Sequence, residues 1–136
     1  MNKRLAAIDF GLKRIGIALS DPTNFLASPL TTVEGGKNAI PNIIRVLSAY
    51  PLEKILVGLP LLMNGKDSDM TTLVRTFAQN LEAAIHIPTL LIDERLTSAQ
   101  ADKFLKEQSF NRKQRSSKID TAAATLLLQH YLDSQR

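Results

Sequence analysis

The feature that most constrains the fold is an almost continuous apolar segment close to the N-terminus. Residues 5–10 read Leu-Ala-Ala-Ile-Asp-Phe, with a single charged side chain among them. A strand of this composition is typical of a sheet that is covered on both faces, usually by helices. The segment therefore predicts an α/β fold with a buried central strand.

Four further strands are predicted along the chain. Residues 15–19 follow a turn at 11–14, so the first two strands are expected to form an antiparallel hairpin. A third strand at 30–33 ends at Gly35-Gly36, and its neighbours in the sequence are loop-forming residues. The last two predicted strands are residues 54–58 and 89–92.

Helical periodicity begins after the third strand. Residues 40–47 carry apolar side chains at helical spacing behind Asn38, a candidate N-cap, and residues 70–85 carry the clearest apolar stripe. A third helix is expected to start at Thr97, and the last helix near Ser117. The order β-β-β-α-β-α-β-α-α predicts one domain over residues 1–136. Its mixed sheet would begin as an antiparallel hairpin, continue with parallel strands and carry helices on both faces.

Composition excludes several classes of site. The chain has no cysteine, which rules out disulfides, thiolate nucleophiles and iron–sulfur clusters, and its two histidines are far apart in the sequence. The basic N-terminus has too short an apolar run for a signal peptide, and the longest apolar stretch, residues 55–63, contains Gly58 and Pro60. We therefore expect a soluble, cytoplasmic protein whose metal chemistry, if it has any, depends on carboxylates.

Acidic side chains occur where buried elements end or begin. Asp9 lies in the first strand, Asp93 and Glu94 follow the fifth, and Asp120 lies beside the apolar stripe of the last helix. In open α/β sheets, ligand-binding groups gather at the carboxyl ends of parallel strands. Adjacent residues of a strand point to opposite sides, so only one of the acidic pair is expected to face a given site.

Each acid also has a plainer explanation. Asp9 could end its strand and cap a turn, and the pair at 93–94 could be a surface pair with Arg95. Asp120 could cap the first turn of the last helix together with Ser117. Taken together, however, several carboxylates within a few ångströms need a cation to remain ionised, and Mg²⁺ prefers oxygen ligands. The reaction that best uses such a site is two-metal phosphoryl transfer.

Four segments resemble the motifs of one family. The resemblance is to the YqgF (RuvX) family, which belongs to the RuvC-like branch of the ribonuclease H fold, and it covers nearly the whole chain in the right order. The matching segments are residues 8–21, residues 57–61 with Met63 and Gly65, residues 93–97, and residues 118–124.

The resemblance implies a ribonuclease H-like fold with a five-stranded mixed sheet. It also implies a Mg²⁺-dependent nuclease, with Mn²⁺ as a substitute ion, that resolves Holliday junctions or matures the 5′ end of 16S rRNA. By position, Asp9, Glu94 and Asp120 would be the catalytic acids and metal ligands, with Asp93 as an additional candidate ligand. Leu62 stands where the family pattern has a polar residue, often Asn.

Basic side chains near these acids are candidates for contacts with phosphates. The net charge of +4 is concentrated in residues 103–118, which hold six basic side chains and one acidic one. We expect contact mainly with the nucleic-acid backbone, because few aromatic residues lie among them. The alternative is an exposed loop kept in solution by its charge. The candidate residues are Lys13, Arg14, Arg95, Arg112, Lys113, Arg115 and Lys118.

Two other functions compete with a nuclease. One is a nucleic-acid-binding module of the same fold without catalysis, which the presence of all three acids disfavours. The other is an actin-like or sugar-kinase-like ATPase, which needs two such domains and therefore a longer chain. The expected partner is structured RNA or branched DNA. A two-fold dimer would suit symmetric cutting of a junction, whereas trimming of rRNA does not require one.

Overall fold

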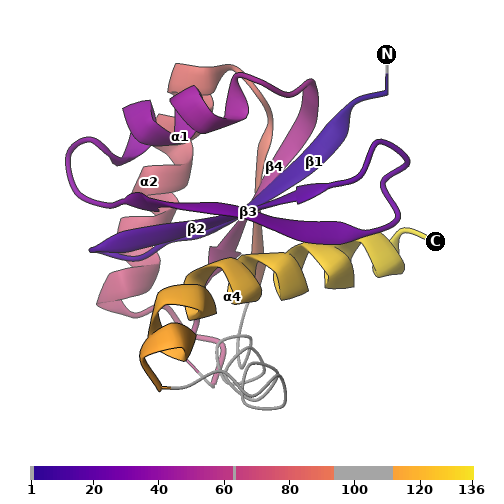
Figure 1. Cartoon of the computed structure of the whole chain (residues 1–136). Helices are drawn as coiled ribbons and strands as arrows, with labels where there is room; N and C mark the ends of the chain where they lie inside the picture. The colour runs from indigo at the N-terminus through magenta and orange to yellow at the C-terminus, as the bar shows by residue number, and fades with distance from the viewer. Residues whose placement is uncertain (1, 63, 94–111) are drawn as a thin grey trace.

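The computed structural model describes residues 2–62, 64–93 and 112–136, with only the backbone described for 112–120. These residues form a five-stranded sheet with helices on both faces (Figure 1). No helix in these ranges is long and apolar enough to cross a membrane. The helix predicted from Thr97 lies outside the described residues. The elements are β1 (Arg4–Asp9), β2 (Arg14–Ser20), β3 (Ala27–Glu34), α1 (Ala39–Leu47), β4 (Leu52–Leu59), α2 (Asp69–Ile85), β5 (Thr89–Asp93) and α4 (Arg112–Ser134).

The sheet is mixed, as the sequence predicts. Its strand order is β3-β2-β1-β4-β5. The first three strands pair antiparallel, with Ile8 opposite Ile17. The neighbours on the other side pair parallel, with Ile8 opposite Val57 and Val57 opposite Leu91. Strand β1 is therefore central, and the carboxyl ends of β1, β4 and β5 meet at one edge of the sheet.

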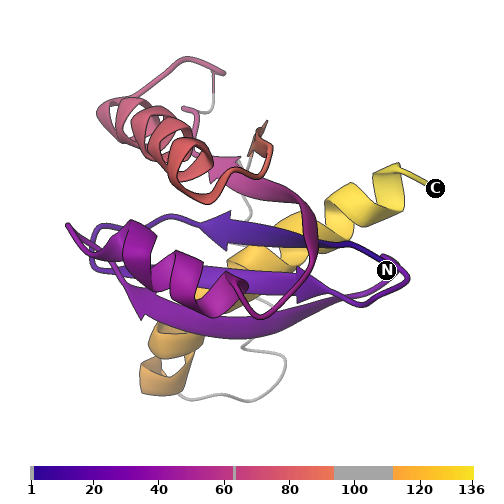
Figure 2. The same cartoon turned by 90° about the horizontal axis from the view of Figure 1, so that it is seen from above.

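Side-chain alternation in β1 divides the core into two layers. Ala6 and Ile8 lie in the cluster formed with α1 and α2, whereas Leu5 and Ala7 lie in the cluster formed with α4. Figures 1 and 2 show α4 on the face of the sheet opposite α1. The apolar segment that predicted burial on both faces is thus covered as expected, and each residue of β1 is assigned to a layer by its parity.

Helix α4 begins earlier than predicted. It starts at Arg112 instead of near Ser117, so the basic stretch before Ile119 is helical backbone and not a loop. The suggestion that Asp120 caps the first turn with Ser117 is therefore wrong. Apolar periodicity misses this part of the helix because arginine, lysine and glutamine are good helix formers that add nothing to an apolar stripe.

Two other boundaries differ from the sequence prediction. Strand β3 extends over Ala27–Glu34, well beyond the predicted residues 30–33, because it pairs with β2 through its backbone along an edge that is only partly buried. Asn38 stands at the N-cap of α1 but makes no side-chain capping hydrogen bond. Helix α2 instead has a capping box that was not predicted, formed by Ser68 and Thr71.

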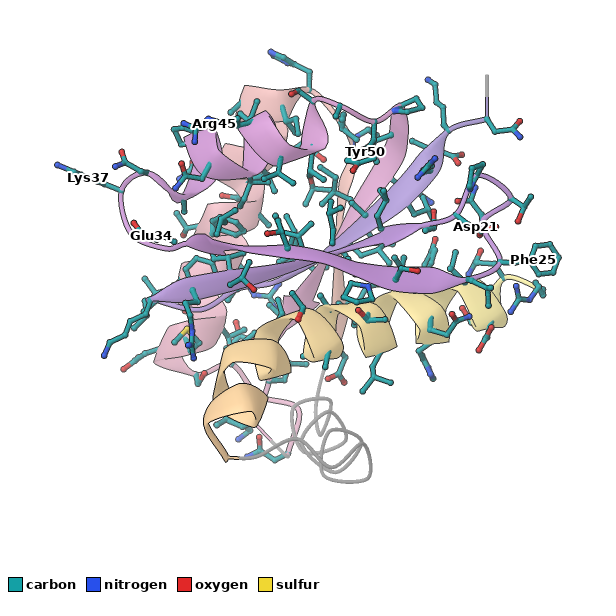
Figure 3. The ribbon with its side chains drawn as sticks, viewed as in Figure 1. Asp21, Phe25, Glu34, Lys37, Arg45 and Tyr50 are labelled. Atoms are coloured by element: carbon teal, nitrogen blue, oxygen red, sulfur yellow. The ribbon has the colours of Figure 1, made fainter. Side chains whose placement is uncertain are left out.

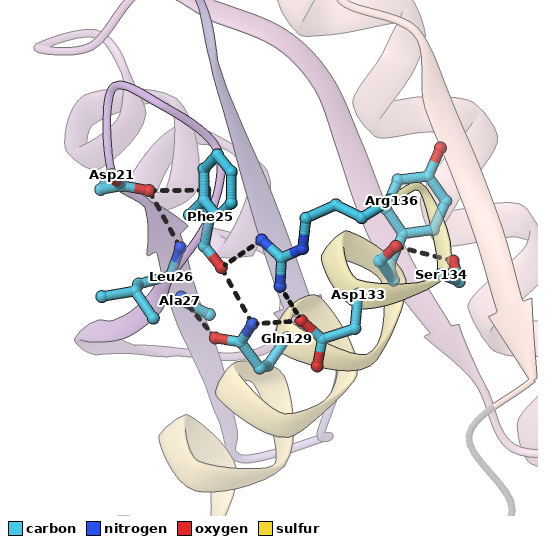
Figure 4. A network of polar contacts seen from close by, with 9 residues as sticks. Asp21, Phe25, Leu26, Ala27, Gln129, Asp133, Ser134 and Arg136 are labelled. Atoms are coloured by element: carbon cyan, nitrogen blue, oxygen red, sulfur yellow. Dashed lines mark hydrogen bonds and ion pairs between the residues drawn. The ribbon is translucent and has the colours of Figure 1, made fainter.

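The far end of the sheet anchors the C-terminal half of α4. Figure 3 shows Asp21 and Phe25 at the opposite end of the sheet from Glu34 and Lys37. The Gln129 side chain donates to the carbonyl of Phe25 (3.0 Å) and accepts from the amide of Ala27 (2.9 Å), as Figure 4 shows. The Arg136 guanidinium lies 4.5 Å from the centre of the Phe25 ring. These contacts hold the last turns of α4 at the end of the sheet where β1 begins.

Asp21 organises the loop that receives α4. Its carboxylate accepts hydrogen bonds from the Thr23 hydroxyl and from the amides of Leu26 (3.0 Å) and Phe25 (2.8 Å). These bonds, that of Thr23 first, hold the pKa of Asp21 below its ordinary value. A carboxyl whose pKa is lower in the folded chain stabilises the fold above its unfolded pKa, and that contribution is lost as the pH falls.

The first prediction is that Asp21→Asn lowers the free energy of unfolding at neutral pH. The difference from wild type should shrink as the pH falls below about 4, the usual pKa of an unfolded aspartate. Urea unfolding followed by circular dichroism over a series of pH values measures it. Glu53→Gln, a change to an exposed acid, is the control. A difference between Asp21→Asn and wild type that is constant with pH would contradict the assigned role.

Candidate active site

Asp9 is the buried carboxylate at the carboxyl end of the central strand. It is the last residue of β1 and only 8% exposed. Alternation places it after Leu5 and Ala7, on the face covered by α4. A buried carboxylate is costly unless it is paired, hydrogen-bonded or bound to a cation, and Asp9 does make polar interactions. Strand β1 ends at Asp9, as the plainer explanation of this residue has it, and the side chain is buried there.

Both strands beside Asp9 carry glycine at the neighbouring position. Gly16 of β2 is its partner in the register, and Gly58 of β4 follows Val57, which pairs with Ile8. The parity of Ala18 and Leu56 places these two glycines on the α4 face as well. Neither neighbouring strand therefore puts a side chain next to the Asp9 carboxylate. The oxygen donors of the carboxylate fit a hard cation such as Mg²⁺.

Asp93 ends β5 at the same edge of the sheet but on the other face. It pairs with Leu59, and its side chain is exposed. Leu91 packs against the cluster under α2, while Ile92 packs against the α4 cluster. Alternation therefore puts Asp93 on the α2 face of the sheet, whereas Asp9 lies on the α4 face. Glu94 and Arg95, the next candidate residues, lie outside the described residues.

The course of α4 carries the backbone of Asp120 toward the end of the sheet where β1 ends. Near the end of the helix, Leu132 packs in the same cluster as Leu5 at the start of β1, and the Tyr131 hydroxyl accepts from Lys54 at the start of β4 (3.2 Å). From Leu132 back to Asp120 the helix rises about 18 Å. From Leu5 to Asp9 the strand advances about 13 Å. Because the two run in opposite directions, the backbone at Asp120 lies toward the edge of the sheet where β1 ends, about 5 Å farther along than Asp9.

The predicted basic residues fall on two described segments near this end of the sheet. Lys13 and Arg14 are exposed in the turn and strand that follow Asp9, and Arg14 pairs in register with Glu34. The backbone of α4 carries Arg112, Lys113, Arg115 and Lys118 in its first two turns, before Asp120. The contact of both sets with one nucleic acid therefore stays a prediction.

The turn between β1 and β2 is held against β3 by close backbone contact. The Gly35 amide donates to the carbonyl of Lys13 (2.9 Å). A Cβ at Gly35 would lie 2.5 Å from the carbonyl oxygen of Leu12, and a Cβ at Gly11 would lie 2.3 Å from that of Arg14. Both contacts are too short for any residue but glycine. The turn beside Asp9 therefore has a defined position.

The loop after β4 is anchored by Thr71, whose role was not foreseen from the sequence. Thr71 is fully buried at the start of α2. Its hydroxyl donates to the carbonyl of Pro60 (2.8 Å) and accepts from the amide of Ser68 (2.9 Å). The spacing Ser-x-x-Thr before an apolar stripe was the available signal, but the usual capping box has Glu or Gln at the last position.

The described residues contain no group of three acidic, histidine or cysteine side chains placed to hold a metal ion. The Glu94 and Asp120 side chains are not among them. The three-acid cluster therefore remains a prediction, of which the position of Asp9 and the course of α4 are the described parts.

Comparisons with known proteins show the family of the chain. A family model described as RuvX, Holliday junction resolvase, matches residues 3–134. A relative from Roseiflexus sp. (strain RS-1) is 43% identical over 98% of this chain and 96% of its own length. A relative from Protochlamydia amoebophila is 40% identical over 97% of this chain and 94% of its own length. Both carry the provisional name pre-16S rRNA nuclease.

Solved structures share the fold at low sequence identity. RuvC from T. thermophilus, in complex with a Holliday junction substrate, has a TM-score of 0.60 at 14% identity, covering 98% of this chain and 95% of RuvC. The Fowlpox virus resolvase, in complex with Holliday junction DNA, has a TM-score of 0.62 at 14% identity, with coverage of 97% and 98%. These likenesses confirm the predicted RuvC-like, ribonuclease H-type fold.

The second prediction is that Thr71→Val destabilises the protein by about 1–3 kcal/mol, because it leaves the Pro60 carbonyl and the Ser68 amide without their buried partner. Chemical denaturation measures the change. Thr72→Val is the matched control, since Thr72 is exposed and its hydroxyl makes only a long contact of 3.5 Å. Equal stability of the two variants would show that the Thr71 hydroxyl does not anchor the loop.

Proposed function

Because the chain belongs to the RuvX family, we propose that it is a nuclease that hydrolyses phosphodiester bonds with divalent metal ions. The family match covers almost the whole chain. The observation that carries the proposal is the placement of Asp9: a buried carboxylate at the carboxyl end of the central strand, with glycine on both neighbouring strands. A buried carboxylate in this position suits a reaction in which divalent cations are held beside a phosphate.

We assign the catalytic roles to Asp9, Glu94 and Asp120. Asp9 ends β1, the backbone of Asp120 belongs to α4, which covers the same face of the sheet, and Glu94 follows Asp93 in the sequence. Two Mg²⁺ ions held by these carboxylates would supply charge neutralisation and an activated water for in-line displacement. The carboxylates themselves would fix the positions of the ions relative to the scissile phosphate. Asp93 stays a secondary candidate, because it lies on the opposite face.

The favoured substrate is precursor 16S rRNA. Relatives at 40% identity or above, matched over almost their whole length, carry that substrate in their provisional names. A Holliday junction is the second candidate, which the description of the family favours. Trimming of rRNA needs one site on one chain, whereas symmetric cutting of a junction needs a two-fold pair of sites.

The third prediction concerns the acids. Asp9→Asn, Glu94→Gln and Asp120→Asn should each reduce Mg²⁺-dependent cleavage of precursor 16S rRNA by at least about 100-fold, since even outer partners of metal ligands are worth about 10–100-fold. Circular dichroism should show an intact fold. Glu53→Gln, at the far end of the sheet, is the control and should cleave like wild type.

Two further measurements complete that test. Asp93→Asn should have a much smaller effect than Asp9→Asn, because its side chain belongs to the α2 face. Four-way junctions assayed in parallel decide between the two substrates. Undiminished cleavage by the triple acid variant would overturn the assignment of the site.

The fourth prediction concerns the basic start of α4. Replacing Arg112, Lys113 and Arg115 by Gln should weaken nucleic-acid binding and flatten its salt dependence. The slope of log K against log salt should change by about 0.7–0.9 for each phosphate that the variant no longer neutralises. Replacing Lys3, Arg4 and Arg45 by Gln removes the same charge away from α4 and serves as the control. An unchanged slope in the α4 variant would contradict a phosphate-binding role.

A further inference from the structure

Two exposed leucines stand on the turns that flank the end of β1. Leu12 is 59% exposed in the turn between β1 and β2, and Leu62 is 47% exposed in the loop after β4. Strands β1 and β4 are neighbours in the sheet, so these two turns start within about one strand spacing, 4.8 Å, of each other. Asp9 ends β1, directly before the first of these turns.

Both leucines are carried by backbone that has little freedom to fold them away. The turn at Leu12 is held by the contact of its carbonyl with Gly35. The loop at Leu62 is closed by two hydrogen bonds, from the Leu62 amide to the Lys66 carbonyl (2.9 Å) and from the Gly65 amide to the Leu62 carbonyl (2.7 Å). Thr71 anchors the same loop to α2. Each leucine is therefore presented to solvent by a rigid turn.

Each leucine also has an exposed lysine beside it. Lys13 follows Leu12 directly, and Lys66 is hydrogen-bonded to Leu62 through the backbone. The acid nearest to Lys66 in sequence, Asp67, is paired with Arg75 through two contacts of 3.1 Å. An apolar tip next to an exposed cation matches a nucleotide, which offers an apolar base face next to an anionic phosphate.

We propose that Leu12 and Leu62 are wedges that pack against unstacked bases of RNA on either side of the cleaved phosphate, while Lys13 and Lys66 contact the adjoining phosphates. The inference rests on the proposed nuclease function and specifies its substrate class: RNA whose stacking is interrupted at the cleaved position, as at a bulge or at the boundary of a duplex and a single strand. Insertion of apolar side chains between bases is an established way to hold a distorted nucleic acid.

Exposure alone would not support this proposal, because single exposed leucines are common on protein surfaces. Leu26, Leu73 and Leu90 are also exposed, at 64%, 48% and 40%. Leu26 lies in the loop at the far end of the sheet, and Leu73 lies on α2. Leu12 and Leu62 differ in sharing the edge of the sheet where Asp9 lies, each with a lysine on the same turn.

The test measures binding without cleavage, in EDTA. The probes are a continuous RNA duplex and the same duplex with a short unpaired bulge. The bulged RNA carries 2-aminopurine beside the bulge, and the continuous duplex carries it at the same sequence position. Wild type should bind the bulged RNA more tightly and raise its 2-aminopurine fluorescence, which reports unstacking. Leu12→Ala with Leu62→Ala should reduce that preference by about fivefold to tenfold and abolish the fluorescence change, with binding of the continuous duplex unaltered.

Two control variants separate the parts of the proposal. Leu26→Ala with Leu73→Ala removes equal apolar surface elsewhere and should behave like wild type. Lys13→Gln with Lys66→Gln should weaken binding of both RNAs alike and flatten the salt dependence, because phosphate contacts do not distinguish them. Thermal unfolding of each variant checks that the fold is retained.

The outcomes are distinguishable. Equal binding of the two RNAs by wild type, or an unchanged preference in the Leu12/Leu62 variant, overturns the wedge proposal and leaves the nuclease proposal standing. Failure of wild type to bind either RNA overturns the proposed function and the wedges with it. The same bulge built in DNA serves as a parallel arm, and a stronger preference there overturns the choice of RNA.

Discussion

Burial of β1 on both faces is the constraint on which the rest of the structure depends. Its side chains alternate between two helical layers, so the parity of each position determines whether it meets α1 and α2 or α4. Asp9 lies on the α4 face because alternation puts it on the same side as Leu5 and Ala7, which pack there. A charge placed there cannot move to solvent without disrupting the strand, and its cost has to be offset by polar partners or cations. The fold thus determines where cation chemistry can occur.

The second half of the candidate site depends on packing at the other end of the molecule. Gln129, Tyr131 and Arg136 contact the end of the sheet where β1 begins. These contacts determine the position of α4 along the sheet. Because a helix rises by a constant step, that anchoring also determines where Asp120 comes to lie. Substitutions at these three residues would therefore change the position of Asp120 relative to Asp9, although they lie at the other end of the sheet.

Patterns that reflect burial were readable from the sequence, and patterns that reflect local hydrogen bonding were not. The apolar segments located β1, β4, β5 and α2, and their order predicted the mixed sheet. The start of α4 at Arg112 was missed because its helical residues carry no apolar stripe, and β3 was predicted too short because it pairs along a partly exposed edge. For the site, Asp9 was found as a charge in a buried strand. Thr71 and Gly35 were missed, because their roles arise from contacts between distant parts of the chain.

Parity also bears on the choice between the two neighbouring acids. The motif match favours Glu94 over Asp93, and consecutive residues of an extended strand lie on opposite faces. Leu91 and Ile92 pack in different layers, so Asp93 continues the α2 side. An acid that joins Asp9 must approach from the α4 side. In the wedge proposal, the turns at Leu12 and Leu62, which follow β1 and β4 at this edge of the sheet, are the part of the site able to distinguish one nucleic acid from another, because cations held by acids suit any phosphate.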